Sequence, residues 1–234
     1  MTDSGPAPMT PARLYLASTS PARLALLRSS GIDPVVLPSD VDEPAAVATA
    51  EEALGRALSP DEMVQLLANA KAYAVLEAHR GELDGFVLGG DSAFVLDGAI
   101  YGKPYTPAVA RERWELQRGR TGVLHSGHAL IDARSGSDDA LVGAVARASV
   151  SFVADLTDAE ISAYIASGEP LQVAGAFTID SLGAPFIERI DGDPSTVVGL
   201  SLPTLRRLLG QFGVAFPDLW TRGSSWDNGD SPTA

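Results

Sequence analysis

The stretch FVLGGDSAFVLDGAIYGKP, residues 86–104, is the part of this sequence that says most about the fold. Two apolar runs, residues 86–88 and 93–96, are typical of short buried strands. The dipeptide Asp97–Gly98 follows the second run, and residues 99–101 again suit a strand. Because Asp-Gly between two such runs is typical of a two-residue turn, we predict a β-hairpin here. At least part of the sheet should therefore be antiparallel.

Strand and helix patterns alternate on both sides of this stretch. The predicted strands are residues 14–17, 35–37, 86–88, 93–96, 99–101, 122–132, 142–154, 176–179 and 186–190. The predicted helices are residues 21–30, 60–79, 107–117, 157–168 and 200–211, and the acidic, alanine-rich residues 43–59 predict a partly helical or loose insertion. No repeat or linker divides the pattern. We therefore expect a single α/β domain over residues 13–215, with a mixed sheet and a cleft between two lobes.

The composition excludes several classes of protein. The 234-residue chain has no cysteine, which excludes thiol catalysis, thiolate zinc sites and disulfide frameworks. It carries 30 acidic against 17 basic side chains, a formal net charge of −13, so we expect no binding to nucleic-acid backbones. Since no run of about 18 apolar residues is present, we also expect no membrane-spanning segment.

The two ends of the chain differ in composition from the rest. Residues 1–12 are rich in proline and small polar residues and lack the basic and apolar regions of a secretory signal. We expect a disordered lead there and a disordered tail over residues 223–234. A cytoplasmic location is the corresponding expectation.

Arginine dominates the basic residues. Of the 17 basic side chains 15 are arginine, and the two lysines are Lys71, in a predicted helix, and Lys103, in a Gly-Lys-Pro sequence after the hairpin. Lysine is a compact charge with rotatable donors, whereas the planar guanidinium of arginine needs more room. The two lysines either serve a compact anionic ligand or survive by chance.

A turn rich in hydroxyl groups, Ser18-Thr19-Ser20, joins the first predicted strand to a helix that begins at Pro21. Hydroxyls and free backbone N–H groups at a helix N-terminus form a pocket for an anion. Arg23, on the first turn of the helix, can add a two-donor grip on a phosphate. The alternative is that Ser20 simply caps the helix.

The segment Gly89-Gly90-Asp91-Ser92 ends an apolar strand, where open α/β sheets place their ligands. Glycine permits close backbone approach, and a carboxylate at this position can hold a divalent cation or take a proton from water. The alternative is an ordinary acidic turn.

Several common catalytic motifs are absent from the sequence. It contains no phosphate-binding P-loop, no zinc-binding histidine spacing and no nucleophile elbow. His125 and His128 have opposite parity on a predicted strand, so their side chains should point to opposite faces of the sheet. We expect both to be structural or surface residues.

Seven segments occur in a recognisable order along the chain. They are LASTSPARLALLRSSGI at 16–32, VDE at 41–43, LANAKA at 67–72, GGDSAFVLDGAIYGKP at 89–104, RGRTG at 118–122, SGEPLQVAGAFTID at 167–180 and GDPSTVVGLSL at 192–202. Together they resemble the Maf family of nucleotide pyrophosphatases, also called septum-formation inhibitor proteins. Each segment alone is weak evidence for the resemblance, but all of them follow the family's order over nearly the whole chain.

This resemblance implies a fold like that of inosine triphosphate pyrophosphatases, often dimeric. It also implies hydrolysis of a nucleoside triphosphate between the α and β phosphates, to monophosphate and diphosphate, with Mg²⁺ or Mn²⁺. The implied catalytic residues are Asp91, which accepts a proton from water and contacts the metal, Glu43, a second acidic ligand of the metal or water, and Lys103. Together with Lys103, the implied ligands of the triphosphate are Ser18, Ser20, Arg23 and Lys71.

Three further positions bear on which nucleobase the substrate carries. In the family's pyrimidine branch, which prefers dTTP and UTP, the positions matching Ala22, Ser92 and Asp180 carry Arg, Thr and Gln, and in its 7-methyl-GTP branch they carry Trp, Gln and Glu. Asp180 is closest to that Glu, and a carboxylate can accept two N–H donors from a guanine edge. Ala22 has no aromatic face for a methylated, cationic guanine. We predict a broad or guanine-leaning preference.

Two other functions are compatible with the sequence. One is a regulator that binds a nucleotide and a partner to restrain cell division, with vestigial hydrolysis, and the other is a non-catalytic carrier of small anions. Asp91, Glu43 and the two lysines favour the enzyme, because a pure binding protein needs no base beside the phosphates. The expected partners are a nucleoside triphosphate and, for a family often dimeric, a second copy of the chain.

Overall fold

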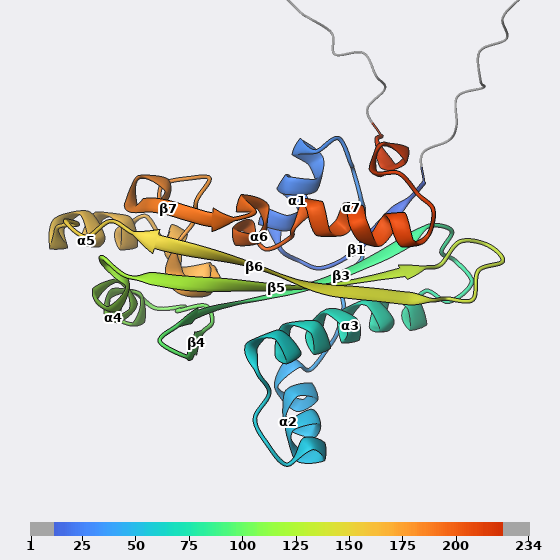
Figure 1. The fold of residues 1–234 in the computed structure, drawn as a ribbon, viewed down its shortest axis with the longest axis horizontal. Helices are drawn as coiled ribbons and strands as arrows, with labels where there is room; N and C mark the ends of the chain where they lie inside the picture. The colour runs from blue at the N-terminus through green and yellow to red at the C-terminus, as the bar shows by residue number, and fades with distance from the viewer. Residues whose placement is uncertain (1–11, 222–234) are drawn as a thin grey trace, which may run out of the picture.

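A computed structural model describes residues 12–221, so the predictions for residues 1–11 and 222–234 lie outside the described residues. The described residues form the expected single α/β domain, built on a mixed sheet of seven strands (Figure 1). The strand order is β2-β1-β3-β5-β6-β7, with β4 paired to one end of β3. β2, β1 and β3 are parallel, whereas β5, β6 and β7 pair antiparallel.

Most elements agree with the predicted ones within a few residues. The strands are β1 Leu14–Ala17, β2 Val35–Val36, β3 Phe86–Leu96, β4 Ala99–Tyr101, β5 Thr121–Asp132, β6 Leu141–Phe152 and β7 Ile187–Gly192. The helices are α1 Pro21–Ser29, α2 Glu43–Leu54, α3 Pro60–Ala78, α4 Pro107–Gln117, α5 Asp158–Ala166, α6 Pro194–Val198 and α7 Leu202–Gln211. Short 3₁₀ turns are η1 Glu169–Gln172, η2 Ala174–Ala176, η3 Ala184–Phe186 and η4 Phe216–Leu219.

Helices cover both faces of the sheet. α2 and α3 lie on one face, and α1, α6 and α7 lie on the other (Figure 1). α4 and α5 lie at the end of the sheet where β4 and β7 are found (Figure 1). We call the face of the sheet that carries α3 the α3 face.

β3 differs from the prediction, because Phe86–Leu96 is one continuous strand rather than two. β5 pairs with it from residue 86 to residue 95, which keeps the Gly-Gly-Asp-Ser segment extended. On its other edge β3 pairs with β1 up to Gly89 and with β4 from Phe94. Residues 90–93 of β3 thus have a strand on one side only, as expected of a ligand site in an open α/β sheet.

Two glycines let α3 lie directly on the sheet. A Cβ atom at Gly89 would overlap the carbonyl oxygen of Ala68, and a Cβ atom at Gly127 would overlap the carbonyl oxygen of Val64. Backbone therefore packs on backbone where α3 crosses β3 and β5, which only glycine allows. This crossing brings Lys71 of α3 over β3.

Three hydrophobic clusters lie against the sheet, and two of them occupy opposite ends of the long strands β3, β5 and β6. In the first, α1 and α7 pack on the sheet through buried leucines, among them Leu16, Leu27, Leu88, Leu205 and Leu209. In the second, α4 and α5 contribute Trp114 and Tyr164 to an aromatic cluster with Phe94, Phe152 and Phe177. Its rings meet mostly edge to face, with centroids 5.0–5.9 Å apart.

The acidic segment 43–59, predicted as partly helical or loose, contains a regular helix, α2. Asp42 caps it by accepting the N–H of Ala45 at 3.0 Å, and Gly55 ends it in the left-handed region at φ +66°. None of its residues is buried, so packing does not hold this helix as it holds α3. Capping and the ion pair of Glu43 with Lys71 fix its N-terminus instead.

The prediction of a strand at 176–179 is wrong. The turn η2 ends at Ala176, and the following loop wraps around the carboxylate of Glu169. That carboxylate accepts hydrogen bonds from the hydroxyls of Thr178 and Ser181 and the N–H groups of Leu182 and Gly183. The donors of this loop are therefore turned toward a single side chain rather than toward a neighbouring strand. The short helix α6, capped by Asp193, was also missed.

His125 and His128 point to opposite faces, as predicted. His125 contacts Asp61 of α3, whereas His128 lies fully buried on the other face. Its Nε2 accepts the N–H of Ser201 at 2.7 Å, at the N-terminus of α7, and burial lowers its pKa to about 4. His128 is therefore a neutral structural residue that ties α7 to the sheet.

Within residues 12–221, none of the helices has both the length and the hydropathy needed to cross a bilayer.

Replacing Gly89 by alanine should destabilise the fold, because the new Cβ forces α3 off β3. We expect Gly89→Ala to lower the free energy of unfolding by roughly 1–3 kcal/mol in a urea titration. Gly210→Ala is the matched control, since Gly210 lies on α7 with open space around it, and the same change there should raise stability by up to about 1 kcal/mol. Equal effects at both sites would contradict this packing.

The buried neutral His128 should make stability depend on pH. A pKa lowered to about 4 means that the unfolded state binds a proton that the folded state does not, so stability falls as pH drops below the unfolded value near 6.5. We expect the free energy of unfolding to be about 2 kcal/mol lower at pH 5 than at pH 7. His128→Gln should flatten this dependence, whereas His79→Gln, at the partly exposed end of α3, should keep it. An unchanged dependence in His128→Gln would show that another group titrates.

Candidate active site

The polar residues singled out in the sequence gather where β1 ends beside β3. β1 leaves the sheet after Ala17, which is opposite Gly89, so the turn that begins at Ser18 comes next to the one-sided segment of β3. Asp91 and Ser92 lie in that segment, and neighbours in a strand point to opposite faces. Asp91 accordingly contacts α3, whereas Ser92 contacts α1.

Lys71 joins two carboxylates on the α3 face. Its Nζ lies 2.7 Å from Oε1 of Glu43 and 2.7 Å from Oδ1 of Asp91. The side chains of Lys71 and Asp91 are only 11% and 13% exposed, whereas Glu43 is 47% exposed. An ammonium group has three donors and can serve both acceptors, which would otherwise repel each other. We call Glu43, Lys71 and Asp91 the carboxylate–lysine cluster.

Burial raises the pKa of Asp91 above the ordinary value of an aspartate. The positive charges of Lys71 and Arg23 oppose this increase, and the negative charge of Glu43 adds to it. A carboxylate with a raised pKa is a better proton acceptor than an exposed one. The environment of Asp91 therefore suits a general base.

Arg23 is buried on the other face and fixes three segments together. Its Nε donates to the carbonyl of Gly199 at 2.7 Å, and its two terminal nitrogens donate to Ser18 Oγ at 3.2 Å and Ser92 Oγ at 2.9 Å. These bonds use three of the five N–H donors of a guanidinium, and two stay available for a ligand. Arg23 also lies close enough to Asp91 for its charge to oppose the increase in the pKa of that carboxyl.

In the turn Ser18-Thr19-Ser20, the last serine caps α1, which was one of the two interpretations of the sequence. Ser20 accepts the N–H of Arg23 at 3.4 Å as the N-cap of α1, so the capping interpretation is confirmed. Ser18 Oγ accepts the N–H of Ser20 at 3.2 Å as well as the guanidinium N–H. Binding of phosphate by these two serines stays a prediction.

Three of the predicted site residues form no hydrogen bond or ion pair, within residues 12–221, with the carboxylate–lysine cluster or with Arg23 and its partners. Lys103 is exposed in the loop between β4 and α4. Ala22 is half-buried on the first turn of α1, and Asp180 is exposed in the loop that wraps around Glu169. Their parts in binding stay predictions.

Sequence reasoning missed two residues that support the site. The carbonyl of Gly199 accepts from Arg23, and Ser126 Oγ lies 2.9 Å from Ser92 Oγ while it donates to the carbonyl of Thr196. The segment GDPSTVVGLSL was the indication, since it contains both Thr196 and Gly199. Only the fold shows that this segment lies beside Ser92.

The oxygen ligands of the site fit a hard divalent cation. Asp91 and Glu43 both reach one ammonium nitrogen, so their oxygens lie close together. No cluster of three or more acidic or histidine ligands exists in residues 12–221. Mg²⁺ needs no such cluster, because it is commonly bound by one or two carboxylates together with substrate phosphates and water.

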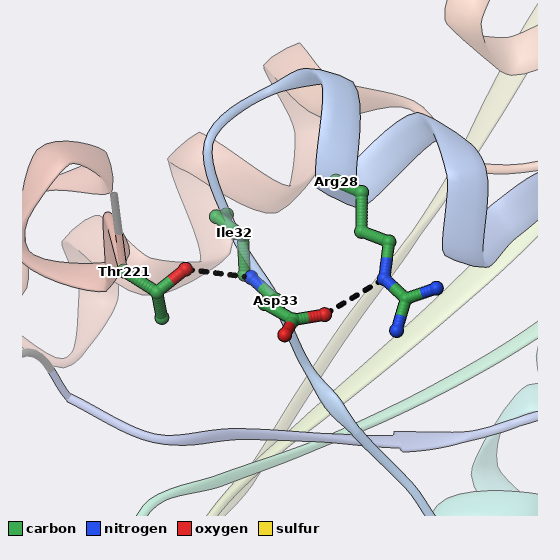
Figure 2. Close-up of a pocket in the computed structure, with 4 residues that line it drawn as sticks. All are labelled: Arg28, Ile32, Asp33 and Thr221. Carbon is green, nitrogen blue, oxygen red and sulfur yellow. Dashed lines mark hydrogen bonds and ion pairs between the residues drawn. The ribbon is translucent and has the colours of Figure 1, made fainter.

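A separate hollow lies at the opposite end of α1 (Figure 2). Arg28, Ile32, Asp33 and Thr221 line it, and Arg28 pairs with Asp33 at 2.7 Å while Thr221 Oγ1 accepts the N–H of Asp33 at 3.0 Å. The ion pair is exposed to solvent. Three of its four lining residues are thus bonded to one another, and none belongs to the site around Asp91.

Residues 13–212 match the family model described as Maf-like protein. The chain belongs to the Maf family. It is 70% identical over 211 residues to a protein named nucleoside triphosphate pyrophosphatase from Leifsonia xyli subsp. xyli, covering 90% of this chain and 97% of that one. It is 51% identical to a protein of the same name from Salinispora tropica, covering 92% and 90%.

Among solved structures, this Maf-family chain is similar to one titled nucleoside-triphosphatase, dITP/XTP pyrophosphatase, from Mycobacterium abscessus. The TM-score is 0.34 at 13% identity, covering 85% of this chain and 93% of that one.

Removing the charge of Lys71 should leave two carboxylates unpaired and destabilise the fold. We expect Lys71→Met to lower the free energy of unfolding by about 3 kcal/mol at pH 7, and Asp91→Asn in the same chain to restore part of this loss. Lys103→Met, which changes an exposed lysine, is the control and should stay within about 0.5 kcal/mol of the wild type. Additive effects of the Lys71 and Asp91 changes would show that the ion pair does not couple them.

Proposed function

We propose that this protein hydrolyses nucleoside triphosphates between the α and β phosphates, giving a nucleoside monophosphate and diphosphate. The observation that carries the proposal is the carboxylate–lysine cluster, in which a buried aspartate with a raised pKa lies beside a lysine and a second carboxylate. The names of the relatives from Leifsonia xyli and Salinispora tropica support the same reaction. Removal of unwanted or modified nucleotides is the role that this activity suggests.

Each residue of the site has a part in this reaction. Asp91 accepts the proton of the attacking water, whose oxygen bonds to the α phosphorus as the bond to the bridging oxygen breaks. Lys71 neutralises charge on the phosphates, and Ser18, Ser20 and the remaining donors of Arg23 hold them. Lys103 approaches from the loop after β4 as a further phosphate ligand.

A divalent cation, Mg²⁺ or Mn²⁺, belongs to the proposal. Asp91 and Glu43 are the residues that would hold it, and when bound it would neutralise charge that develops on the phosphate oxygens. The proximity of these two carboxylates to one cation, Lys71, supports this assignment.

The overall charge of the protein opposes the binding of a triphosphate, so the attraction must be local. The formal net charge is −13, which would repel a polyanion at a distance. Arg23 is buried and the side chain of Lys71 is only 11% exposed, so near Asp91 both charges are screened less than at the surface. Association should therefore depend on a few cations at one site and on a metal ion.

For the base, we propose a broad or guanine-leaning preference. Asp180 is exposed and free of recorded partners among the described residues, so its carboxylate can accept two N–H groups of a guanine edge. Ser92 Oγ is already bonded to Arg23 and Ser126 on the side of the sheet away from α3. The expected homodimer and cytoplasmic location are predictions on the same footing.

A panel of natural and modified nucleoside triphosphates, with Mg²⁺ or Mn²⁺ and product identification by ion-exchange chromatography, tests the reaction and the base together. We expect monophosphate and diphosphate in equal amounts, with turnover at least about a hundredfold lower in Asp91→Asn. Asp138→Asn, which removes an exposed carboxylate in the β5–β6 loop, is the charge-matched control and should keep full activity.

Three outcomes of the same panel would contradict the proposal. Release of orthophosphate would mean a different cleavage site. Nucleotide binding without turnover would favour a regulator of cell division, and clear preference for UTP and dTTP would overturn the base assignment.

A further inference from the structure

A second group of charged side chains lies on the α3 face, outside the carboxylate–lysine cluster. The Nδ1 atom of His125 is 2.6 Å from Oδ1 of Asp61, at the N-terminus of α3. Arg147 of β6 binds the same carboxylate through Nε, at 3.0 Å, and through its second terminal nitrogen. The proposed function gives this triad no role, and the sequence alone had suggested only a structural or surface histidine.

The sheet register places His125 beside Asp91. α3 rests on Gly89 of β3 and on Gly127 of β5. Asp91 follows Gly89 by two residues, and His125 precedes Gly127 by two residues on the antiparallel strand, so both lie on the same side of α3. Since Asp91 pairs with Gly127 and His125 with Ala93, the two side chains are diagonal neighbours on one face, with Cα atoms about 7–8 Å apart.

The bond to Asp61 determines which ring nitrogen of His125 is available. Both oxygens of Asp61 accept N–H groups of Arg147, and a carboxylate in such an ion pair accepts hydrogen bonds rather than donating them. The proton therefore sits on Nδ1, and Nε2 is an acceptor that points away from Asp61. Within residues 12–221 no protein partner is recorded for Nε2, and the side chain is 12% exposed.

We propose that His125 is a further catalytic residue, whose Nε2 accepts a hydrogen bond from the water that Asp91 activates. The inference rests on the proposed function. A diagonal separation leaves room for one water between the carboxylate of Asp91 and the imidazole. The water gives one proton to Asp91, and its second O–H bond is directed at Nε2, so that a lone pair of its oxygen faces the α phosphorus. Asp61 and Arg147 are positioning residues for the imidazole.

Two substitutions separate this role from a structural one. His125→Asn places an amide where Nδ1 lies, so it keeps the bond to Asp61 and loses Nε2, whereas His125→Gln reaches the position of Nε2 and loses the bond to Asp61. We expect His125→Asn to lower kcat at least about tenfold with KM changed less than about threefold, at an unchanged unfolding temperature. His125→Gln should retain more of the wild-type kcat than His125→Asn. His79→Gln, on the partly exposed histidine at the end of α3, is the control and should match the wild type.

Steady-state rates of diphosphate release decide the outcome. Wild-type kcat in His125→Asn, with the loss confined to His125→Gln, would overturn the proposal and leave His125 as a structural partner of Asp61. If the wild-type enzyme itself released no diphosphate, the proposed function would fail and this inference with it. An active wild type with an unaffected His125→Asn would contradict this inference alone.

Discussion

The contact between the backbone of α3 and the sheet, at Gly89 and Gly127, is the constraint on which the site depends. Here the helix touches the strand, and Lys71 meets Asp91 in the segment of β3 that has a strand on one side only. The same crossing leaves Asp91 and His125 together on one side of the helix. Packing thus determines which charged groups are neighbours.

The charge arrangement around Asp91 results from that packing. Burying an ionised carboxylate costs free energy unless cations lie near it. Lys71 and Arg23 approach Asp91 from the two faces of the sheet. Arg23 is held by Ser18, Ser92 and Gly199, so its position does not depend on a ligand. Lys71 instead binds two carboxylates that would also suit a metal ion. Arg23 therefore has structural contacts, whereas Lys71 lies where the proposed chemistry takes place.

The sequence predicted the elements well where local chemistry dictates them. The hairpin at Asp97–Gly98 is correct because both residues adopt positive φ, at 51° and 80°, which Asp and Gly tolerate. The helices start at Ser20, Ser59, Thr106 and Thr157, whose side chains all cap them. Asp91, Glu43 and Lys71 were named from motifs, and in the structure Lys71 contacts both carboxylates.

Features that depend on distant partners were not predictable. β3 is continuous across Gly-Gly-Asp-Ser because β5 pairs along it, and residues 177–183 form a loop because Glu169 collects their donors. The proposed role of His125 could not be predicted from its position along the strand, because it depends on Asp61, which lies 64 residues away in the chain. Lys103 and Asp180 are the reverse case. Sequence motifs named them as site residues, but both are exposed and neither has a contact with the site within residues 12–221.

A crystal structure with Mn²⁺ and a nucleotide whose α–β bridge is a methylene group tests the central claim most directly. We expect an anomalous manganese peak in contact with carboxylate oxygens of both Asp91 and Glu43, with the α phosphate beside Asp91 and Lys71 bound to phosphate oxygens. A metal or triphosphate bound away from this cluster, with Lys71 still between the two carboxylates, would contradict it.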